Sequence, residues 1–222
     1  MNIHIICPLW RTHLVPTLIH YLEPMNIQWH PIMTAKEQVD FDPPWVHPLI
    51  VEEHPTDKTF RAFRKPNEFI RTQEIIDDDY YGFMSDEDMY EPGFFDVIRK
   101  QTAKILMFSL YRGDTLIKDG PKKIHWHPAT PLIVNGFKNI KVGSIGLPQY
   151  IIKGSILKVS QFRNDHYYND GHFAMMLAER FPHHIKFLPD LFVFAAYLQL
   201  GRYTKKEAFL KPNWELPVII YN

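Results

Sequence analysis

Tyr80-Tyr81-Gly82-Phe83-Met84-Ser85-Asp86-Glu87-Asp88 is an apolar, aromatic-rich run that opens directly into three acidic residues. The run predicts a short buried strand, and the acidic triplet follows at the point where this strand becomes a loop. In open α/β sheets, ligands bind in the crevice beyond the carboxyl ends of the strands. Asp86 and Asp88 alternate around Glu87, so their carboxylates can face one hard cation. The stretch therefore predicts a Mg²⁺ or Mn²⁺ site at the edge of an α/β sheet, against the alternative of a solvated acidic loop.

The segments on either side of this stretch alternate between strand and helix patterns. In the N-terminal half we expect strands over 3–7, 28–33, 46–51 and 80–84, with helices over 14–22 and 65–76. Such alternation predicts a parallel, doubly wound sheet flanked by helices. In the second half we expect strands over 105–111 and 140–157, with helices over 91–100 and 171–181, and two apolar runs follow over 185–188 and 191–198. The predicted fold class is α/β, with a mostly parallel central sheet and a smaller strand-rich region.

The composition is that of an ordinary globular chain without a net charge. Its 222 residues include 25 basic and 25 acidic side chains, so we expect no nucleic-acid partner, and any phosphate binding must be local. The single cysteine, Cys7, excludes an internal disulfide and favours a reducing compartment. No run approaches the roughly 20 apolar residues that span a bilayer, and the N-terminus lacks a signal-peptide pattern. We therefore expect a cytoplasmic protein without a transmembrane segment, an expectation compatible with peripheral membrane association through a partner.

The order of motifs around the triplet resembles that of the GT-A glycosyltransferases, in particular the large family-2-like group. Their pattern is a hydrophobic strand, a DxD-type acidic motif, a spacer with proline and a helix, and residues 81–95 follow that order. The resemblance implies that Asp86 and Asp88 bind Mn²⁺ or Mg²⁺ and that Asp86 and Glu87 contact the sugar donor. It also implies a departing nucleotide diphosphate, whose developing charge such a metal neutralises.

Two upstream segments resemble the nucleotide-binding motifs of the same family. Pro8-Leu9-Trp10-Arg11 follows the first strand, and the resemblance implies that this loop binds the donor, with Trp10 stacking on the base. The alternative is that Trp10 is a core aromatic residue. Arg64-Lys65-Pro66-Asn67-Glu68-Phe69-Ile70-Arg71 is similar to the family's segment reading roughly Ala-Arg-Asn-x-Gly-Ile, although Phe69 stands where that motif has glycine. This similarity implies nucleotide contacts by Arg64, Lys65 and Asn67.

Fewer residues bear on the identity of the nucleotide base. The family often carries an acidic residue after its second strand that reads uracil, whereas Ile32-Met33-Thr34-Ala35 offers none. Arg61, Arg64 and Lys65 form a local basic cluster that can meet a diphosphate or line a solvated face. We expect a UDP-sugar as the donor and a carbohydrate or glycan as the acceptor.

Sugar transfer to a hydroxyl group requires a general base near the donor sugar. Asp170 begins a predicted helix, and in inverting GT-A enzymes a helix at this point begins with the acidic base, so the resemblance implies that role for Asp170. The alternative is that Asp170 only caps the helix, because aspartate is among the best N-capping residues. His172 is a candidate for a further metal ligand or a phosphate contact, with a structural role as the alternative.

Two other polar clusters fit the predicted metal chemistry less well. Asp77-Asp78-Asp79 precedes the strand at 80–84 and so lies at the edge opposite to the crevice, where we expect a solvated turn. His125 and His127 share one face of a predicted strand, but no third ligand stands at a spacing typical of zinc sites.

These observations predict one GT-A-like domain over 1–222, with a nucleotide-sugar-binding half over about 1–100 and an acceptor-binding half over about 101–222. The expected activity is metal-dependent transfer of a sugar from a nucleotide diphosphate sugar to an acceptor hydroxyl, with inversion. A nucleotidyltransferase shares the architecture but usually carries a Gly-rich basic loop after the first strand, and Pro8-Leu9-Trp10-Arg11-Thr12 has no glycine. A non-catalytic nucleotide- or sugar-binding module is a further alternative, and it needs no base at Asp170.

Overall fold

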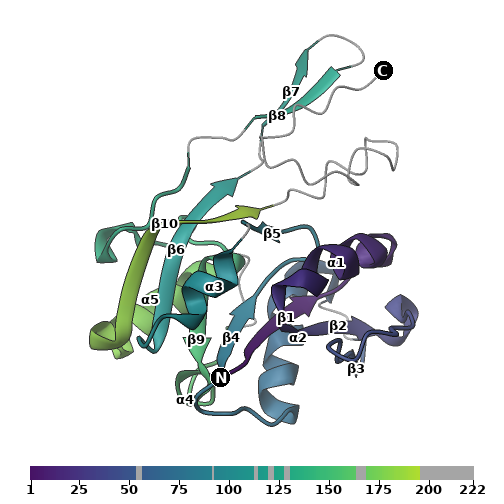
Figure 1. Cartoon of the computed structure of the whole chain (residues 1–222), viewed down its shortest axis with the longest axis horizontal. Helices are drawn as coiled ribbons and strands as arrows, with labels where there is room; N and C mark the ends of the chain where they lie inside the picture. Colours follow the sequence, from purple (N-terminus) through teal and green to yellow (C-terminus); the bar gives the residue numbers. More distant parts are fainter. Residues whose placement is uncertain are drawn as a thin grey trace.

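The computed structural model has the α/β architecture that the sequence predicts (Figure 1). It describes residues 1–53, 57–91, 93–112, 115–119, 123–127, 131–163 and 169–195. Within 57–62, at 112, and within 115–119 and 123–127, it describes the backbone only. Among the described residues, none of the helices combines the length and the apolar character that crossing a bilayer requires.

The N-terminal half supplies four parallel strands. They are β1 (Ile3–Pro8), β2 (Gln28–Thr34), β3 (Leu49–Val51) and β4 (Tyr80–Phe83), in the spatial order β3-β2-β1-β4. β1 pairs in parallel with both β2 and β4, and β2 pairs in parallel with β3. β1 is buried on both faces, which explains why its apolar residues run almost without alternation.

The second half completes an eight-stranded mixed sheet. Its strands are β5 (Met89–Tyr90), β6 (Ile105–Arg112), β9 (Tyr150–Lys153) and β10 (Ile185–Ala195), added in the order β9-β6-β10-β5. β9 runs antiparallel to both β4 and β6, β10 is parallel to β6, and β5 is antiparallel to β10. Parallel pairs still outnumber antiparallel ones, so the mostly parallel sheet is confirmed.

Helices cover both faces of the sheet (Figure 1). On one face, α1 (Val15–Leu22) and α3 (Phe94–Arg99) pack into the same core cluster as β1. On the other face, α2 (Asp57–Thr72), α4 (Gly154–Leu157) and α5 (Asn169–Arg180) form a second core cluster. Short 3₁₀ turns occupy Thr12–Leu14, Glu23–Met25, Ala35–Glu37, Phe137–Asn139, Leu147–Gln149 and Pro182–His184.

The strand expected over 140–157 is wrong except for β9. Residues 137–139 and 147–149 are 3₁₀ turns, and α4 begins directly after β9. Proline and glycine interrupt the apolar run here, since Pro148 lacks a ladder donor and Gly143 adopts a positive φ of 78°. The buried Gln149 side chain closes the turn by accepting the Gly146 N–H at 2.7 Å and donating to the Phe108 carbonyl at 3.2 Å.

Other element bounds also differ from the expected ones. The helix expected over 65–76 spans Asp57–Thr72, with Pro66 inside it. The two apolar runs over 185–188 and 191–198 lie, as far as residue 195, in one strand, β10, whose register with β6 shifts between Leu188 and Phe192. The helix expected over 91–100 starts at Phe94, after Gly93 in the left-handed region, and its proline, Pro92, lies outside the described residues.

A separate two-stranded sheet extends beyond the end of β6 (Figure 1). It consists of β7 (Thr115–Asp119) and β8 (Lys123–His127), which pair antiparallel. His125 and His127 lie on β8 in register with Ile117 and Thr115 of β7. Their side chains lie outside the described residues.

Candidate functional site

The acidic triplet, Asp86-Glu87-Asp88, lies at the carboxyl edge of the parallel strands. β4 ends at Phe83 opposite Ile6 of β1, and the Met84 N–H still donates to the Ile6 carbonyl at 3.1 Å. The chain after β1 therefore passes next to the triplet. The expected position at this edge is confirmed, because the strand register alone brings the two loops together.

Asp86 binds the loop that follows β1. Its Oδ2 accepts the backbone N–H of Trp10 at 2.7 Å and that of Arg11 at 2.6 Å, and its Oδ1 accepts the Arg11 guanidinium. The Asp86 side chain is completely buried. These donors compensate the desolvation of the carboxylate, which would otherwise be costly. Asp86 thus joins the two sequence motifs that the resemblance assigns to the donor.

Glu87 and Asp88 complete the triplet and are also buried. A second nitrogen of Arg11 lies 3.1 Å from Glu87 Oε2, so one guanidinium spans two of the three acids. Asp88 accepts the Ser85 N–H at 2.7 Å, and its own N–H donates to the Ser85 carbonyl at 3.1 Å. The triplet is therefore an ordered, buried loop, and the alternative of a solvated acidic loop is wrong.

Lys65, on α2, binds residues of the loops at the same edge. Its side chain is 1% exposed, and its ammonium donates to the Leu9 carbonyl at 2.8 Å and to Glu37 Oε2 at 2.7 Å. The same ammonium lies 4.8 Å from the centre of the Trp10 ring, within cation–π range. Lys65 therefore anchors the loop carrying Trp10, and its ammonium points to protein partners.

Glu37 is a residue of this edge that the sequence reasoning missed. It stands directly after β2, and its carboxylate accepts the backbone N–H of Thr34 at 2.8 Å as well as the Lys65 ammonium. An acidic residue therefore follows the second strand after all, slightly later than the segment Ile32-Met33-Thr34-Ala35 in which none was found. The signal was present as the capping pattern Thr34-x-x-Glu37, which turns the glutamate back onto the strand end.

Arg64 and Asn67, the other expected contacts on α2, bind backbone groups of the protein. The Arg64 guanidinium donates to the Glu52 carbonyl at 2.6 Å. The Asn67 amide donates to the Phe162 carbonyl at 2.8 Å and accepts the Phe162 N–H at 3.0 Å. Both side chains thus join α2 to neighbouring loops, and a nucleotide contact by either stays a prediction. The side chain of Arg61, the third member of the basic cluster, lies outside the described residues.

Asp170 lies in the first turn of α5, near the carboxyl end of β4. Burial, and then the charge of Asp170, raise the pKa of Tyr150 well above its ordinary value. Tyr150 begins β9, and its ring packs against Phe83, the last residue of β4. Asp170 Oδ1 accepts the N–H of Gly171 at 2.8 Å. His172 follows on the same turn and is partly exposed. Phe173, one turn further along α5, packs against both Phe83 and Tyr150, so the first turns of α5 lie beside the carboxyl end of β4.

The side-chain oxygens at this edge can be compared with the ligands that a metal ion requires. In the described part of the chain, no three His, Cys, Asp or Glu side chains converge as ligands for a metal ion. Mg²⁺ and Mn²⁺ commonly use one or two carboxylates and take further oxygens from substrate phosphates. The triplet fits that chemistry, because it consists of hard oxygen donors. Its carboxylates already pair with a cation, the Arg11 guanidinium, which occupies the place that a metal ion would take.

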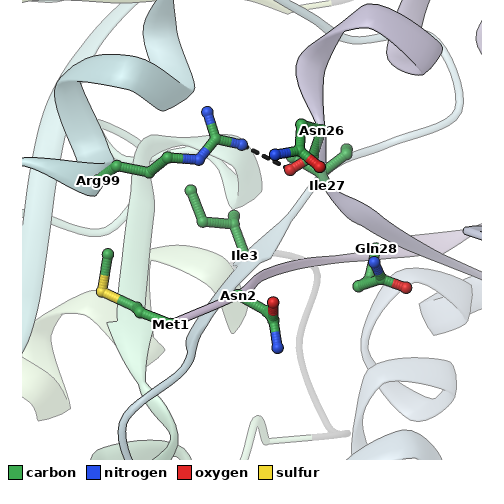
Figure 2. A pocket seen from close by; sticks show the side chains of 7 residues that line it. All are labelled: Met1, Asn2, Ile3, Asn26, Ile27, Gln28 and Arg99. Atoms are coloured by element: carbon green, nitrogen blue, oxygen red, sulfur yellow. Dashed lines mark hydrogen bonds between the residues drawn. The ribbon is translucent and has the colours of Figure 1, made fainter.

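The opposite edge of the sheet contains a different set of polar residues. A small pocket there lies at the amino ends of β1 and β2, where the Arg99 guanidinium donates to the carbonyls of Met25 and Asn26 (Figure 2). Asp79, expected to be a solvated turn residue, is buried and accepts the Asn2 N–H at 2.6 Å. That expectation is wrong for Asp79, because β1 runs alongside β4 and brings donors to its carboxylate. Asp77 and Asp78 are exposed, as expected.

Comparisons with known proteins show the fold. No family model matches the chain, and no curated protein matches it either. The crystal structure of S. aureus TarS residues 1–349 has a TM-score of 0.58 at 12% identity, covering 90% of this chain and 61% of that one. The chain therefore shares the α/β fold of that structure. The TarS structure in complex with UDP-GlcNAc has a TM-score of 0.54 at 12% identity, covering 88% of this chain and 58% of that one. The chain therefore spans about three fifths of the length of these structures.

Proposed function

We propose that the protein is a metal-dependent glycosyltransferase that moves a sugar from a nucleotide diphosphate sugar, a UDP-sugar, to an acceptor hydroxyl with inversion. The observation that carries the proposal is the hydrogen bonding between the loop after β1 and the triplet after β4. Asp86 accepts the backbone N–H groups of Trp10 and Arg11. Both segments lie at the carboxyl ends of β1 and β4, the edge at which open α/β sheets bind ligands. The TarS structure with bound UDP-GlcNAc supports UDP as the nucleotide to test first.

In this proposal the nucleotide-binding edge lies within the half over about 1–100. Trp10 stacks on the base, and Lys65, whose ammonium lies over the Trp10 ring and donates to the Leu9 carbonyl, holds the loop in place. Glu37, at the end of β2, is a candidate for reading the base. Arg11 contributes a planar guanidinium, which suits bidentate contact with phosphate oxygens.

Asp86 and Asp88 would hold Mn²⁺ or Mg²⁺, with His172 as a further candidate ligand. The metal, when bound, neutralises negative charge on the leaving nucleotide diphosphate. Asp170 takes the proton of the acceptor hydroxyl, whose oxygen forms the new bond to the anomeric carbon while the bond to the diphosphate breaks. Support for this role is the position of Asp170 on α5 one turn before Phe173, whose ring packs against Phe83 at the carboxyl end of β4.

Calorimetric titration with UDP and UDP-GlcNAc, each with and without Mn²⁺, tests the donor site. We expect binding that Mn²⁺ strengthens in the wild type and in Asp78→Asn, an exposed acid at the opposite edge. In Asp88→Asn, the part of the affinity that depends on Mn²⁺ should disappear. The absence of Mn²⁺-linked binding for both ligands in the wild type would refute the proposal.

Asp170→Asn separates an enzyme from a binding module. UDP release from UDP-GlcNAc, followed in the presence of a panel of sugar acceptors, should fall by about 10²-fold or more, because loss of a general base typically costs 10²–10⁴-fold in rate. Nucleotide affinity should stay within about threefold of wild type, because the substitution leaves the loop after β1 and the triplet intact. Equal UDP release by wild type and variant would remove Asp170 from the mechanism.

A further inference from the structure

The acidic triplet already holds a cation that belongs to the chain. The Arg11 guanidinium bonds to Asp86, and a second nitrogen lies 3.1 Å from Glu87 Oε2. Arg11 is 21% exposed, whereas the Asp86 side chain is completely buried. Water therefore has little access to the Asp86 carboxylate, and the guanidinium supplies the compensating charge.

A second cation cannot join this arrangement without a cost. A divalent ion at the triplet would lie within a few ångströms of the guanidinium, at a buried site where charges are weakly screened. It would also need carboxylate oxygens that now accept hydrogen bonds from Arg11. Either Arg11 leaves the triplet or the ion binds weakly.

We infer that Arg11 competes with the divalent cation for the triplet, so that the metal and the nucleotide diphosphate bind together and not independently. The inference rests on the proposed function. A diphosphate supplies oxygen ligands to the ion and gives the guanidinium a new bidentate acceptor. The triplet alone therefore has a low affinity for the ion, and the nucleotide raises it. By thermodynamic linkage, the ion raises the nucleotide affinity by the same factor.

The position of Arg11 in the chain supports this coupling. Arg11 directly follows Trp10, and the backbone N–H groups of both residues bind Asp86. These two backbone bonds hold the loop after β1 at the triplet without the guanidinium. The guanidinium can then change its acceptor while the loop stays in place, which a flexible side chain does more readily than a backbone segment.

The test measures Mn²⁺ affinity directly, from the electron paramagnetic resonance signal of free Mn²⁺, with and without UDP. In the wild type we expect weak binding of Mn²⁺ alone and at least about tenfold tighter binding with UDP. Arg11→Gln removes the competing charge, so its affinity for Mn²⁺ alone should rise by about tenfold or more, and the gain on adding UDP should shrink. Asp88→Asn in the Arg11→Gln background should abolish the new affinity, which places it at the triplet.

Arg99→Gln is the matched control. Arg99 makes the same kind of contacts, with Asp96 and two backbone carbonyls, and is 27% exposed, but it lies at the opposite edge of the sheet (Figure 2). This variant should bind Mn²⁺ as the wild type does. Arg11→Lys, which keeps a charge but loses the planar fork, should show a smaller rise than Arg11→Gln. If Arg11→Gln does not fold, as judged by circular dichroism, Arg11→Lys decides the question by the same criterion.

The outcomes separate the inference from the proposed function. Unchanged or weaker affinity for Mn²⁺ alone in a folded Arg11 variant would overturn the competition, even if UDP and Mn²⁺ bind together to the wild type. Failure of every variant to bind UDP in the presence of Mn²⁺ would overturn the proposed function. In that case a rise in affinity for Mn²⁺ alone in Arg11→Gln would still support the competition at the triplet.

Discussion

At the scale of single residues, Lys65 shows how burial changes the role of a charged side chain. The resemblance in the sequence implies contact with the nucleotide, but the ammonium donates to Leu9 and Glu37 inside the protein. Lysine is rarely fully buried unless it is paired. By joining α2 to the chain segments after β1 and β2, Lys65 stabilises the edge on which the candidate site is built.

Lys65→Met should therefore lower the free energy of unfolding by about 3 kcal/mol, because removal of one partner leaves Glu37 and the Leu9 carbonyl without their buried donor. Urea denaturation measures the change. Lys36→Met is the control, since Lys36 is 78% exposed in its ion pair with Glu53 and should cost less than about 1 kcal/mol. Equal losses of unfolding free energy in the two variants would show that the buried ion pair stabilises the protein no more than the exposed one.

A second residue-scale feature is a stack of histidines at the opposite edge of the sheet. His4 Nδ1 lies 2.9 Å from His30 Nε2, and the ring of His47 stacks on that of His30. The Asp79 carboxylate lies 3.3 Å from His4 Nε2. Burial, and then the neighbouring charges of His4 and His47, lower the pKa of His30 to about 3. Burial tends to raise the pKa of Asp79, but hydrogen bonds from Asn2 and His4 outweigh it and lower that pKa.

These shifts predict a loss of stability in mild acid. A solvated histidine has a pKa of about 6.5, so between that pH and about 3 the unfolded chain binds a proton at His30 that the folded chain excludes. As the pH is lowered through this window, the free energy of unfolding should fall by up to about 1.4 kcal/mol per pH unit for this proton. Urea denaturation from about pH 8 to about pH 4 should show a shallower fall in His30→Gln than in the wild type. His20→Gln, at an exposed position on α1, should keep the wild-type slope.

At the scale of elements, β9 lies between β4 and β6 in the middle of the sheet, and its junction with α4 is tightly packed. β9 is antiparallel to both of its neighbours, and α4 begins immediately after it at Gly154. The Gly154 N–H donates to the Asp79 carbonyl at 2.9 Å, so the junction lies against the loop that leads into β4. A Cβ at Gly154 would lie 2.0 Å from the Ile76 carbonyl oxygen. Only glycine allows this approach.

Gly154→Ala should destabilise the protein by about 3 kcal/mol or more, because the clash is with backbone and not with a side chain that can rotate away. Thermal and urea unfolding measure the loss. At Gly136, an added Cβ would meet no atom within 4 Å, so Gly136→Ala should change stability by less than about 0.5 kcal/mol. A Gly154→Ala protein as stable as Gly136→Ala would contradict the packing at this junction.

At the scale of the whole molecule, the two edges of the sheet are chemically distinct. The carboxyl edge carries the triplet with Arg11 and Trp10, while the amino edge carries the histidine stack, Asp79 and the small pocket at Arg99. Because ligand binding at one edge adds its free energy to the stability of the folded chain, it should raise the melting temperature as a whole.

UDP and Mn²⁺ together, at about 100 times the dissociation constant, should add about 2.7 kcal/mol to the unfolding free energy. For a chain of 222 residues this corresponds to a rise in melting temperature of roughly 5–10 °C. A thermal-shift titration measures the rise, and UDP or Mn²⁺ alone should give less. A full-size shift with UDP alone would argue against metal dependence.

Sequence patterns were enough to predict the alternation of strands and helices in the N-terminal half and the place of the triplet at a strand end. These features depend on the local pattern of apolar residues, which can be read along the chain. The sequence also indicated a helix over 171–181 with Asp170 at its start, whereas α5 begins at Asn169 and contains Asp170 in its first turn. The order of motifs that resembles a glycosyltransferase was likewise visible in the sequence. The sequence pattern over 140–149 wrongly predicted a strand, since its buried apolar residues Ile140, Ile145 and Leu147 lie in turns and irregular chain.

The partners of the charged residues, in contrast, follow from the three-dimensional packing of the chain. Asp86 meets Arg11 across a sequence separation of 75, Lys65 meets Glu37 across 28, and Asp79 meets Asn2 across 77. Such pairs depend on how strands align in the sheet, and no local pattern encodes that alignment. The sequence therefore indicates which residues are candidates for the site, whereas the packing of β1 against β4 decides which of them are already paired.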